Sequence, residues 1–201
     1  MVYRAVGNKL AIDFGELALP IPDNFALKIL GSIGFKVTEV DIVGEARKLV
    51  GAAYRRAARL SEAPNVFDCS GFVKYIYGLS GIWLPRRSIQ QREQGVSVEI
   101  EGRRPGDIVF RNGWIDYYRN DPQDGVGHVG IISNYDSVIH AANKNSGVIE
   151  SSIEPFIEEC NFRGIRRMMP EIGFCVLETP EQREVEIFDD IRWIVLQNLD
   201  C

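Results

Sequence analysis

Residues 67–73 read Phe-Asp-Cys-Ser-Gly-Phe-Val, and the prediction of the fold starts from this stretch. Apolar residues recur at helical spacing after it, which predicts a helix. This apolar stripe consists of Phe72, Val73, Ile76 and Leu79. Asp68 has a side chain suited to capping the N-terminus of the helix, and Gly78 and Gly81 mark its exit. We therefore predict a helix that starts near Cys69, with the thiol in its first turn.

Cys69 is a candidate nucleophile because of this position. Free backbone N–H groups and the positive end of the helix dipole favour a thiolate at the first turn. The same N–H groups, those of Cys69 and Ser70 among them, can donate to the oxyanion that forms when a thiolate attacks a carbonyl group. In the alternative interpretation, Cys69 is a small apolar residue of the core.

Upstream, apolar residues recur at steps of three and four between Asp41 and Leu60, with basic residues between them. This pattern predicts a first helix, with Asp41 as its N-cap and Tyr54 at the edge of its apolar stripe. A loop over 61–65 separates it from the second helix. Residues 1–40 mix short apolar runs with proline and glycine, and we expect an irregular segment with one short helix there.

Downstream of Pro105 the hydrophobic period changes to that of strands. Short segments rich in valine and isoleucine are bounded there by turn residues. The expected strands are 107–110, 126–133, 137–141, 147–151 and, as a further one, 161–169, after a short helix over 88–94. Helices followed by strands predict an α+β domain in which the N-terminal helices pack on a central antiparallel sheet.

The length of 201 residues corresponds to about one domain. We expect the domain itself to cover 41–170. Residues 1–40 would form an N-terminal extension, and 171–201 a C-terminal extension packed on the domain. The C-terminal part offers another strand and an apolar tail over 188–199, which the pattern leaves unassigned.

Charge and hydropathy exclude several classes of protein. The chain has 23 Lys and Arg against 28 Asp and Glu, for a net charge of −5, which argues against binding of nucleic acid or anionic lipid. The longest stretches without charge are too short to cross a bilayer, and glycine interrupts them. We therefore expect no nucleic-acid partner and no membrane insertion.

The cysteines and the N-terminal sequence bear on the compartment. Charged residues from Arg4 to Glu16 break every candidate for the apolar core of a secretory signal. The four cysteines are Cys69, Cys160, Cys175 and Cys201. They lie far apart and include no C-x-x-C pair, so they are too few for a disulfide scaffold and wrongly spaced for zinc. We expect a cytoplasmic protein with free thiols, which leaves export by another route open.

The two histidines of the chain, His128 and His140, each lie in an expected strand. These strands look like a hairpin that turns through Asn134. The separation of 12 residues puts the midpoint at Asn134, so that a three- or five-residue loop makes the two imidazoles face each other directly on one side of the sheet. One ring can then accept a thiol proton while the other orients it.

Two other interpretations of the histidines stay open. They can be core residues whose ring nitrogens bond to backbone carbonyl groups, or they can be zinc ligands together with a cysteine. Two histidines and one distant cysteine make a poor closed zinc site, so we expect no metal.

Taken together, these residues resemble the NlpC/P60 family of papain-like cysteine peptidases. The resemblance runs from about Ile42 to Arg167 and depends on the order and spacing of several motifs. They are F-D-C-S-G-F-V at 67–73, G-I-W-L-P-R at 81–86 with Ser88 and Gln91, P-G-D-I-V-F at 105–110, G-H-V-G-I at 127–131, V-I-H-A at 138–141 and G-V at 147–148. The resemblance implies the papain-like fold of that family and hydrolysis of amide bonds in cell-wall peptides, usually next to a D-γ-glutamyl residue.

The resemblance also implies roles for single residues. Cys69 would be the nucleophile, His128 the general base and His140 the third residue, which orients the base. Tyr54 is the counterpart of the tyrosine that the family often uses as an oxyanion donor. Here Arg-Arg-Ala-Ala follows it in place of Trp-Gly-Gly, and it lies a few residues farther upstream than usual. Ordinary packing is the alternative for Tyr54.

Further residues are candidates for substrate binding. Arg86, Ser88 and Gln91 would line a groove for an acidic peptide, with a solvated loop as the alternative for Arg86. Asp68 is expected to act mainly as a helix cap. The segment 111–125 is longer than the usual connection in the family, and Trp114 and two tyrosines within it are expected either to shape substrate access or to pack as a surface insertion.

We expect a cysteine hydrolase that needs no metal or organic cofactor. It would cleave γ-D-glutamyl or related amide bonds in peptidoglycan-derived peptides, such as muropeptides, through a thioester acyl-enzyme. One alternative keeps the thiol chemistry in an amidase or acyltransferase that acts on another isopeptide, in a toxin or a phage-associated role. The other is a non-catalytic binding module on the same fold, which predicts an occluded and unreactive Cys69. The sequence leaves the oligomeric state open.

Overall fold

The computed structural model describes residues 3–113, 125–169 and 173–199. The chain divides into two compact units. One of them, the site unit, comprises Asp41–Ile76 and Leu84–Met168 and holds every candidate site residue. The other, the terminal unit, comprises Met1–Val40, Tyr77–Trp83 and Met169–Cys201.

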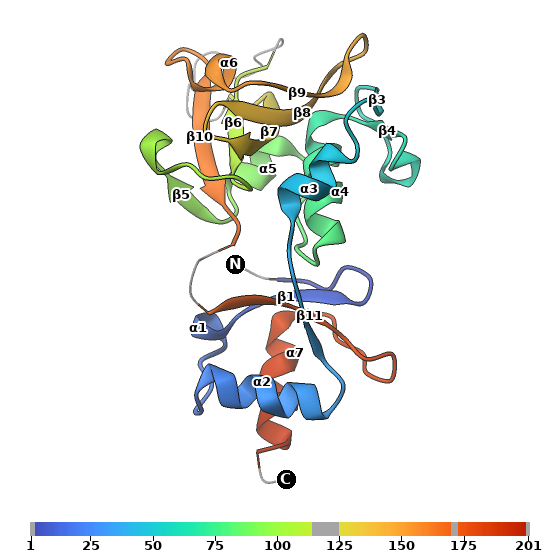
Figure 1. Ribbon diagram of the computed structural model, residues 1–201, viewed down its shortest axis with the longest axis vertical. Coiled ribbons are helices and arrows are strands. Elements are labelled where there is room, and N and C mark those ends of the chain that lie inside the picture. The colour runs from blue at the N-terminus through green and yellow to red at the C-terminus, as the bar shows by residue number, and fades with distance from the viewer. Residues whose placement is uncertain (1–2, 114–124, 170–172, 200–201) are drawn as a thin grey trace. The chain divides into compact units, whose positions relative to one another are not determined.

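The site unit contains a six-stranded antiparallel sheet (Figure 1). Its strands are β5 (Val96–Val98), β6 (Ile108–Arg111), β7 (His128–Asn134), β8 (Ser137–Asn143), β9 (Gly147–Ser152) and β10 (Phe162–Arg167). Their order in the sheet is β5-β10-β6-β7-β8-β9, and every neighbouring pair is antiparallel. The five strands predicted after Pro105 are thereby confirmed as β6 to β10.

Short helices and strands complete the site unit. They are α3 (Ile42–Arg47), β3 (Ala53–Tyr54), η1 (Leu60–Glu62), β4 (Val66–Phe67), α4 (Cys69–Leu79, whose last turn belongs to the terminal unit), α5 (Ser88–Arg92), η2 (Ile100–Gly102) and α6 (Glu154–Ile157). α3 lies against β7, α5 against β10 and α6 against β6. The predicted α+β class, with helices packed on an antiparallel sheet, is confirmed.

The helix α4 begins at Cys69, as the sequence predicts. Asp68 caps it, because the backbone N–H of Gly71 donates a hydrogen bond of 2.7 Å to the Oδ1 atom of Asp68. The apolar stripe of the helix is buried except at Leu79, which is exposed. The cap and the buried stripe together hold the thiol in the first turn.

The helix before it is much shorter than predicted. α3 ends at Arg47, and Gly51, with a φ of +94°, redirects the chain. The N–H of Gly51 donates to the carbonyl of Val148 in β9, and β3 then pairs in parallel with β4. The prediction of a helix that continues to Leu60 is therefore wrong. The backbone after Gly51 bonds to strands distant in the sequence, and the local apolar spacing does not reveal them. As a result, Tyr54 lies on a strand.

The terminal unit has a sheet of its own with the order β1-β11-β2. Its elements are β1 (Lys9–Asp13), α1 (Phe14–Leu17), α2 (Asp23–Ser32), β2 (Lys36–Thr38), β11 (Phe174–Glu178) and α7 (Phe188–Gln197). α7 packs against α1, α2 and β1. The expectation of an irregular segment with one short helix before residue 41 is wrong, because the partner of β1 is a strand from the other end of the chain. The unassigned apolar tail is the helix α7.

Within the described part of the chain, none of the helices combines the length and the apolar character that a bilayer span requires.

Candidate active site

Cys69 lies at the N-terminus of α4 and lines a pocket of about 1280 Å³ within the site unit. The residue is half-buried. Its sulfur is a hydrogen-bond acceptor for the backbone N–H groups of Ser70 and of Val129 on β7. The start of α4 thus lies beside the strand that carries His128.

The thiol of Cys69 is protonated in the free protein at neutral pH. Burial raises its pKa to about 11, and the negative charge of Asp68 adds to this effect. The N–H groups of Ser70 and Val129 act in the opposite direction but are outweighed. The N–H groups at the helix N-terminus favour the thiolate, as expected, but the effect of burial on the pKa is larger. Such a thiol requires a base before it attacks.

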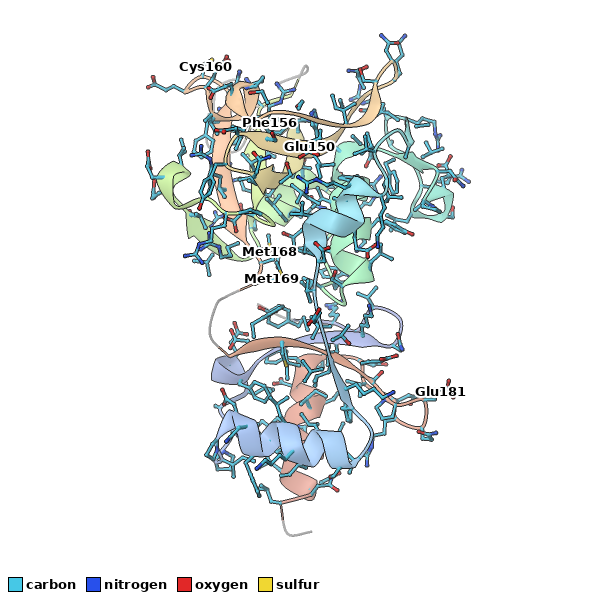
Figure 2. The ribbon with its side chains drawn as sticks, viewed as in Figure 1. Glu150, Phe156, Cys160, Met168, Met169 and Glu181 are labelled. Atoms are coloured by element: carbon cyan, nitrogen blue, oxygen red, sulfur yellow. The ribbon has the colours of Figure 1, made fainter. Side chains whose placement is uncertain are left out.

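The two histidines lie side by side in the core of the site. The Nε2 atom of His128 is 2.7 Å from the Nδ1 atom of His140, and the ring centroids are 4.9 Å apart. Phe156 of α6, labelled in Figure 2, packs against both rings with centroid distances of 5.6 and 5.1 Å. This apolar contact fixes the orientation of both imidazoles.

The hairpin register differs from the predicted one. The turn lies at residues 135–136, where the side chain of Asn134 accepts the N–H of Asp136, so the hairpin midpoint comes later than predicted. His140 is consequently opposite Gly130 and diagonal to His128. The prediction of directly opposite imidazoles is wrong, although both rings lie on the same face of the sheet and meet across the diagonal.

Ser151 of β9 continues the hydrogen-bonded chain beyond the histidines. The Nε2 atom of His140 lies 3.0 Å from the Oγ atom of Ser151, which itself donates to the carbonyl oxygen of Ser152 at 3.4 Å. A Ser151 hydroxyl that donates to Ser152 has its oxygen available to accept the Nε2–H of His140. In that tautomer His140 Nδ1 accepts the Nε2–H of His128, and His128 Nδ1 is unprotonated.

Ser151 was not predicted from the sequence. It lies on the same sheet face as His140 because the β8–β9 register pairs His140 with Ile149, two residues away. A strand pattern alone does not define this register. The sequence offered one signal, which was a serine at the end of the strand predicted over 147–151, next to the strand of His140.

Both histidines are neutral at pH 7. Burial lowers the pKa of His140 to about 4 and that of His128 well below its ordinary value. The positive charge of Arg111 lowers both pKa values further, and His140 lowers that of His128. The resting site therefore pairs a neutral imidazole with a neutral thiol, and a proton moves between them only when the reaction starts.

Arg86 lines the pocket, as predicted, but its guanidinium is occupied. Its Nη2 donates to Asp68 Oδ2 at 2.6 Å and to the carbonyl of Ala58 at 2.6 Å, and its Nη1 donates to Asp68 Oδ1 and to Ser70 Oγ at 2.9 and 3.0 Å. The expectation that Gln91 lines the groove is wrong, because Gln91 is fully buried and its amide donates to the carbonyl of Ser70 at 2.9 Å. These bonds hold the start of α4, and with it the nucleophile, in place.

Tyr54 and Ser88 line the same pocket. Burial raises the pKa of Tyr54, and the negative charge of a neighbouring thiolate raises it further, so the hydroxyl stays a proton donor beside the sulfur. The proposed contribution of Trp114, Tyr117 and Tyr118 to substrate access falls outside the described residues.

Comparison with known proteins shows the family of the chain. A model of the NlpC/P60 family matches residues 51–167, which is more than half of the chain. The chain belongs to the NlpC/P60 family.

Curated and solved NlpC/P60 relatives show how far the likeness extends. A probable endopeptidase of Corynebacterium glutamicum is 36% identical over 123 residues, 60% of this chain and 52% of the relative. A gamma-DL-glutamyl hydrolase of Bacillus subtilis is 32% identical over 130 residues, 64% of this chain and 29% of the relative. A crystal structure of an NlpC/P60 family protein from Bacillus cereus superposes with a TM-score of 0.57 at 26% identity, over 67% of this chain and 42% of that one.

The likeness is confined to the NlpC/P60 domain. The matched region spans about half the length of the Corynebacterium relative (52%) and a smaller share of the Bacillus hydrolase (29%). Within this domain, Cys69, His128 and His140 line one pocket together with Tyr54. A thiol, a neutral base and a phenolic donor around one cavity are the groups needed for acyl transfer.

Proposed function

We propose that this protein is a cysteine peptidase that hydrolyses γ-D-glutamyl amide bonds in peptides derived from peptidoglycan. The observation that carries the proposal is the hydrogen-bonded chain from His128 through His140 to Ser151, which engages Nε2 of His128 and leaves its Nδ1 for the pocket that Cys69 and His128 both line. Membership of the NlpC/P60 family and relatives named endopeptidase and gamma-DL-glutamyl hydrolase support the reaction class.

The proposed reaction begins with proton transfer. His128 Nδ1 takes the proton of the Cys69 thiol, and the sulfur attacks the carbonyl carbon of the scissile amide. The N–H of Cys69 and the hydroxyl of Tyr54 are the proposed donors to the resulting oxyanion. The C–N bond then breaks, His128 returns its proton to the leaving amine, and a thioester with Cys69 remains.

Water completes the cycle. His128 Nδ1 accepts a proton from the water as the water oxygen attacks the thioester carbon. The C–S bond breaks, the sulfur recovers the proton from His128, and the product leaves as the free acid, which loses its proton to water. His140 accepts the Nε2–H of His128 and so orients the base without exchanging a proton with the substrate.

The half-buried position of Cys69 beside a pocket favours catalysis over a non-catalytic binding module. Such a module requires no neutral base directed at a thiol. Iodoacetamide labelling of Cys69 that is lost in His128→Ala would contradict such a module, because a thiol with a raised pKa needs a neighbouring base to react at neutral pH.

The proposal is tested by incubating the protein with γ-D-glutamyl muropeptides and identifying the products by mass spectrometry. We expect wild type to cleave, Cys69→Ala to be inactive and Cys160→Ala, which removes an exposed thiol that does not line the pocket, to keep its activity. Absence of cleavage by wild type, or equal cleavage by Cys69→Ala, contradicts the proposal. The cytoplasmic location stays a prediction, which cell fractionation tests.

A further inference from the structure

Arg111 occupies a particular place beside the reacting groups. It is the last residue of β6 and pairs in register with His128 of β7. Its Cζ atom lies 5.0 Å from the ring centroid of Phe156, the same ring that packs against both histidines. A cation over an aromatic ring is held by the ring quadrupole, so the guanidinium has a defined position next to the catalytic pair.

The charge of Arg111 has no carboxylate partner within the described part of the chain. Other half-buried arginines do: Arg86 pairs with Asp68 at 2.6 Å, and Arg167 pairs with Asp107 at 2.8 Å. The Nε atom of Arg111 is buried and bonds to none of the described groups. Of the described acidic residues, Glu158 exerts an electrostatic effect on Arg111, but its carboxylate accepts a hydrogen bond from Asn161.

Keeping this cation unpaired is costly. Burial lowers the pKa of Arg111, which shows that the guanidinium loses part of its hydration there. A thiolate at Cys69 raises the pKa of Arg111. The guanidinium is therefore within electrostatic range of the nucleophile. A half-desolvated cation at a pocket wall is a site that an anionic group of a ligand satisfies.

The described lining of the pocket as a whole is positively charged, as Arg111 is. The arginines along its described lining are Arg56, Arg59, Arg86, Arg87 and Arg111. Asp68 is the sole carboxylate among those described lining residues, and it is neutralised by its ion pair with Arg86. The chain as a whole has a net charge of −5, so a positively charged pocket is the opposite of what the composition predicts. Such a pocket favours an anionic ligand.

We propose that Arg111 binds a carboxylate of the substrate next to the scissile amide, so that the enzyme selects anionic peptides over their neutral amide counterparts. The inference rests on the proposed peptidase function and adds a specificity-determining residue to it. Arg111 lines the same pocket as Cys69, pairs in register with His128 and is within electrostatic range of the nucleophile. We therefore assign the carboxylate to a residue directly on either side of the bond that is cleaved.

Substrate binding at Arg111 also bears on the base. The positive charge of Arg111 disfavours the imidazolium that His128 becomes during the reaction. A carboxylate bound to Arg111 cancels much of that repulsion, whereas a carboxamide does not. An anionic substrate is thus expected to have a more stable transition state, and therefore a higher kcat, as well as a higher affinity than its neutral amide.

The test uses matched γ-D-glutamyl peptides and the intact chain. One pair differs only in whether the α-carboxyl of the D-glutamyl residue is a carboxylate or a carboxamide, and a second pair differs in the same way at the residue after the scissile bond. We expect wild type to prefer one carboxylate peptide over its amide by at least about tenfold in kcat/KM, the size of one charge-assisted hydrogen bond. The pair that shows the preference identifies which carboxylate Arg111 binds.

Variants assign the preference to Arg111. Arg111→Gln should lower kcat/KM for the preferred peptide by at least about tenfold and leave its amide unchanged or faster, while Arg111→Lys keeps part of the preference. Arg166→Gln removes the same charge from β10 outside the pocket lining and should behave as wild type. Equal losses on both peptides in Arg111→Gln, or a wild type without preference, overturn the inference while the peptidase function stands.

Binding separates the two proposals. Calorimetric titration of the same peptides into Cys69→Ala, with and without Arg111→Gln, measures the preference without turnover. An Arg111-dependent preference in binding supports the inference even where wild type fails to cleave, which contradicts only the peptidase function. No cleavage and no such preference overturn both.

Discussion

The Nε2 atom of His140 lies 3.0 Å from the Oγ atom of Ser151, and the hydroxyl proton of Ser151 is directed at the carbonyl oxygen of Ser152. The direction of this bond determines which nitrogen of His128 is unprotonated. If the hydroxyl donated to His140 instead, each proton would shift one step and His128 Nδ1 would carry one. Ser151 is therefore a positioning residue that acts through His140.

Ser151→Ala should lower kcat by about tenfold with little change in KM, because it removes the acceptor that holds the tautomer of His140 and touches no substrate. Ser151→Thr keeps the hydroxyl and should retain most of the rate. Steady-state kinetics on a γ-D-glutamyl peptide checks both. A loss in Ser151→Thr as large as in Ser151→Ala would mean that packing, and not the hydrogen bond, explains the effect.

The pH dependence follows from the depressed pKa values of the histidines. Burial and the charges of His140 and Arg111 lower the pKa of His128, so the base stays neutral and active below pH 6.5. The acid limb of the kcat/KM profile should therefore lie below the ordinary histidine pKa of about 6.5. In Arg111→Gln this limb should move to higher pH, since one of the charges that lowers the pKa is gone. An acid limb at or above pH 6.5 in wild type contradicts the neutral resting pair.

Much of the site could be predicted because its residues are marked locally. Cys69 follows a capping residue and opens an apolar helix, and His128 and His140 lie in short segments rich in valine and isoleucine that turn residues bound. Such features depend only on neighbours in the sequence. The same is true of strands β6 to β10, whose turn residues mark their ends.

The features that the sequence did not reveal depend on partners far along the chain. Tyr54 lies on a strand because β3 pairs with β4, and Ser151 reaches His140 through the β8–β9 register. Arg111 was noted only as the start of a long connection, and its relation to Phe156 exists only in three dimensions. The net rise in the pKa of Cys69 was not predicted, because it comes from burial, which is a tertiary quantity.

Asp68→Asn tests the link between stability and thiol chemistry at the start of α4. The change leaves the half-buried Arg86 without its counterion and should destabilise the protein by roughly 2 kcal/mol in urea unfolding. Because the charge of Asp68 raises the pKa of Cys69, its removal should also move the iodoacetamide labelling of Cys69 to lower pH. Asp136→Asn, an exposed change outside the pocket lining, serves as the control. An unchanged labelling profile in Asp68→Asn would show that this charge does not act on the thiol.

Gly130→Ala tests whether the diagonal arrangement of the two histidines requires a residue without a side chain at position 130, opposite His140. A Cβ atom at Gly130 would lie 3.0 Å from the Cβ of His140 and would also clash with Val138, so the strand carrying His140 must shift. Overpacking of this kind costs roughly 1–3 kcal/mol. The shift should also lengthen the 2.7 Å contact between His128 and His140 and lower kcat in the folded protein.

The matched control for this change is Gly102→Ala, where the added Cβ meets only the Val98 side chain at an ordinary 3.6 Å. Its stability should stay within about 0.5 kcal/mol of wild type, and its rate should be unchanged. Thermal unfolding gives the folded fraction, and kcat is measured well below the midpoint of the unfolding transition. The two measurements together distinguish a loss of folded protein from a displacement of the histidines within folded protein. A Gly130→Ala protein that is destabilised but turns over at the wild-type rate would show that the proton path tolerates a displaced His140. A protein that loses rate in larger proportion than its folded fraction would show that the rate depends on the spacing of the two rings.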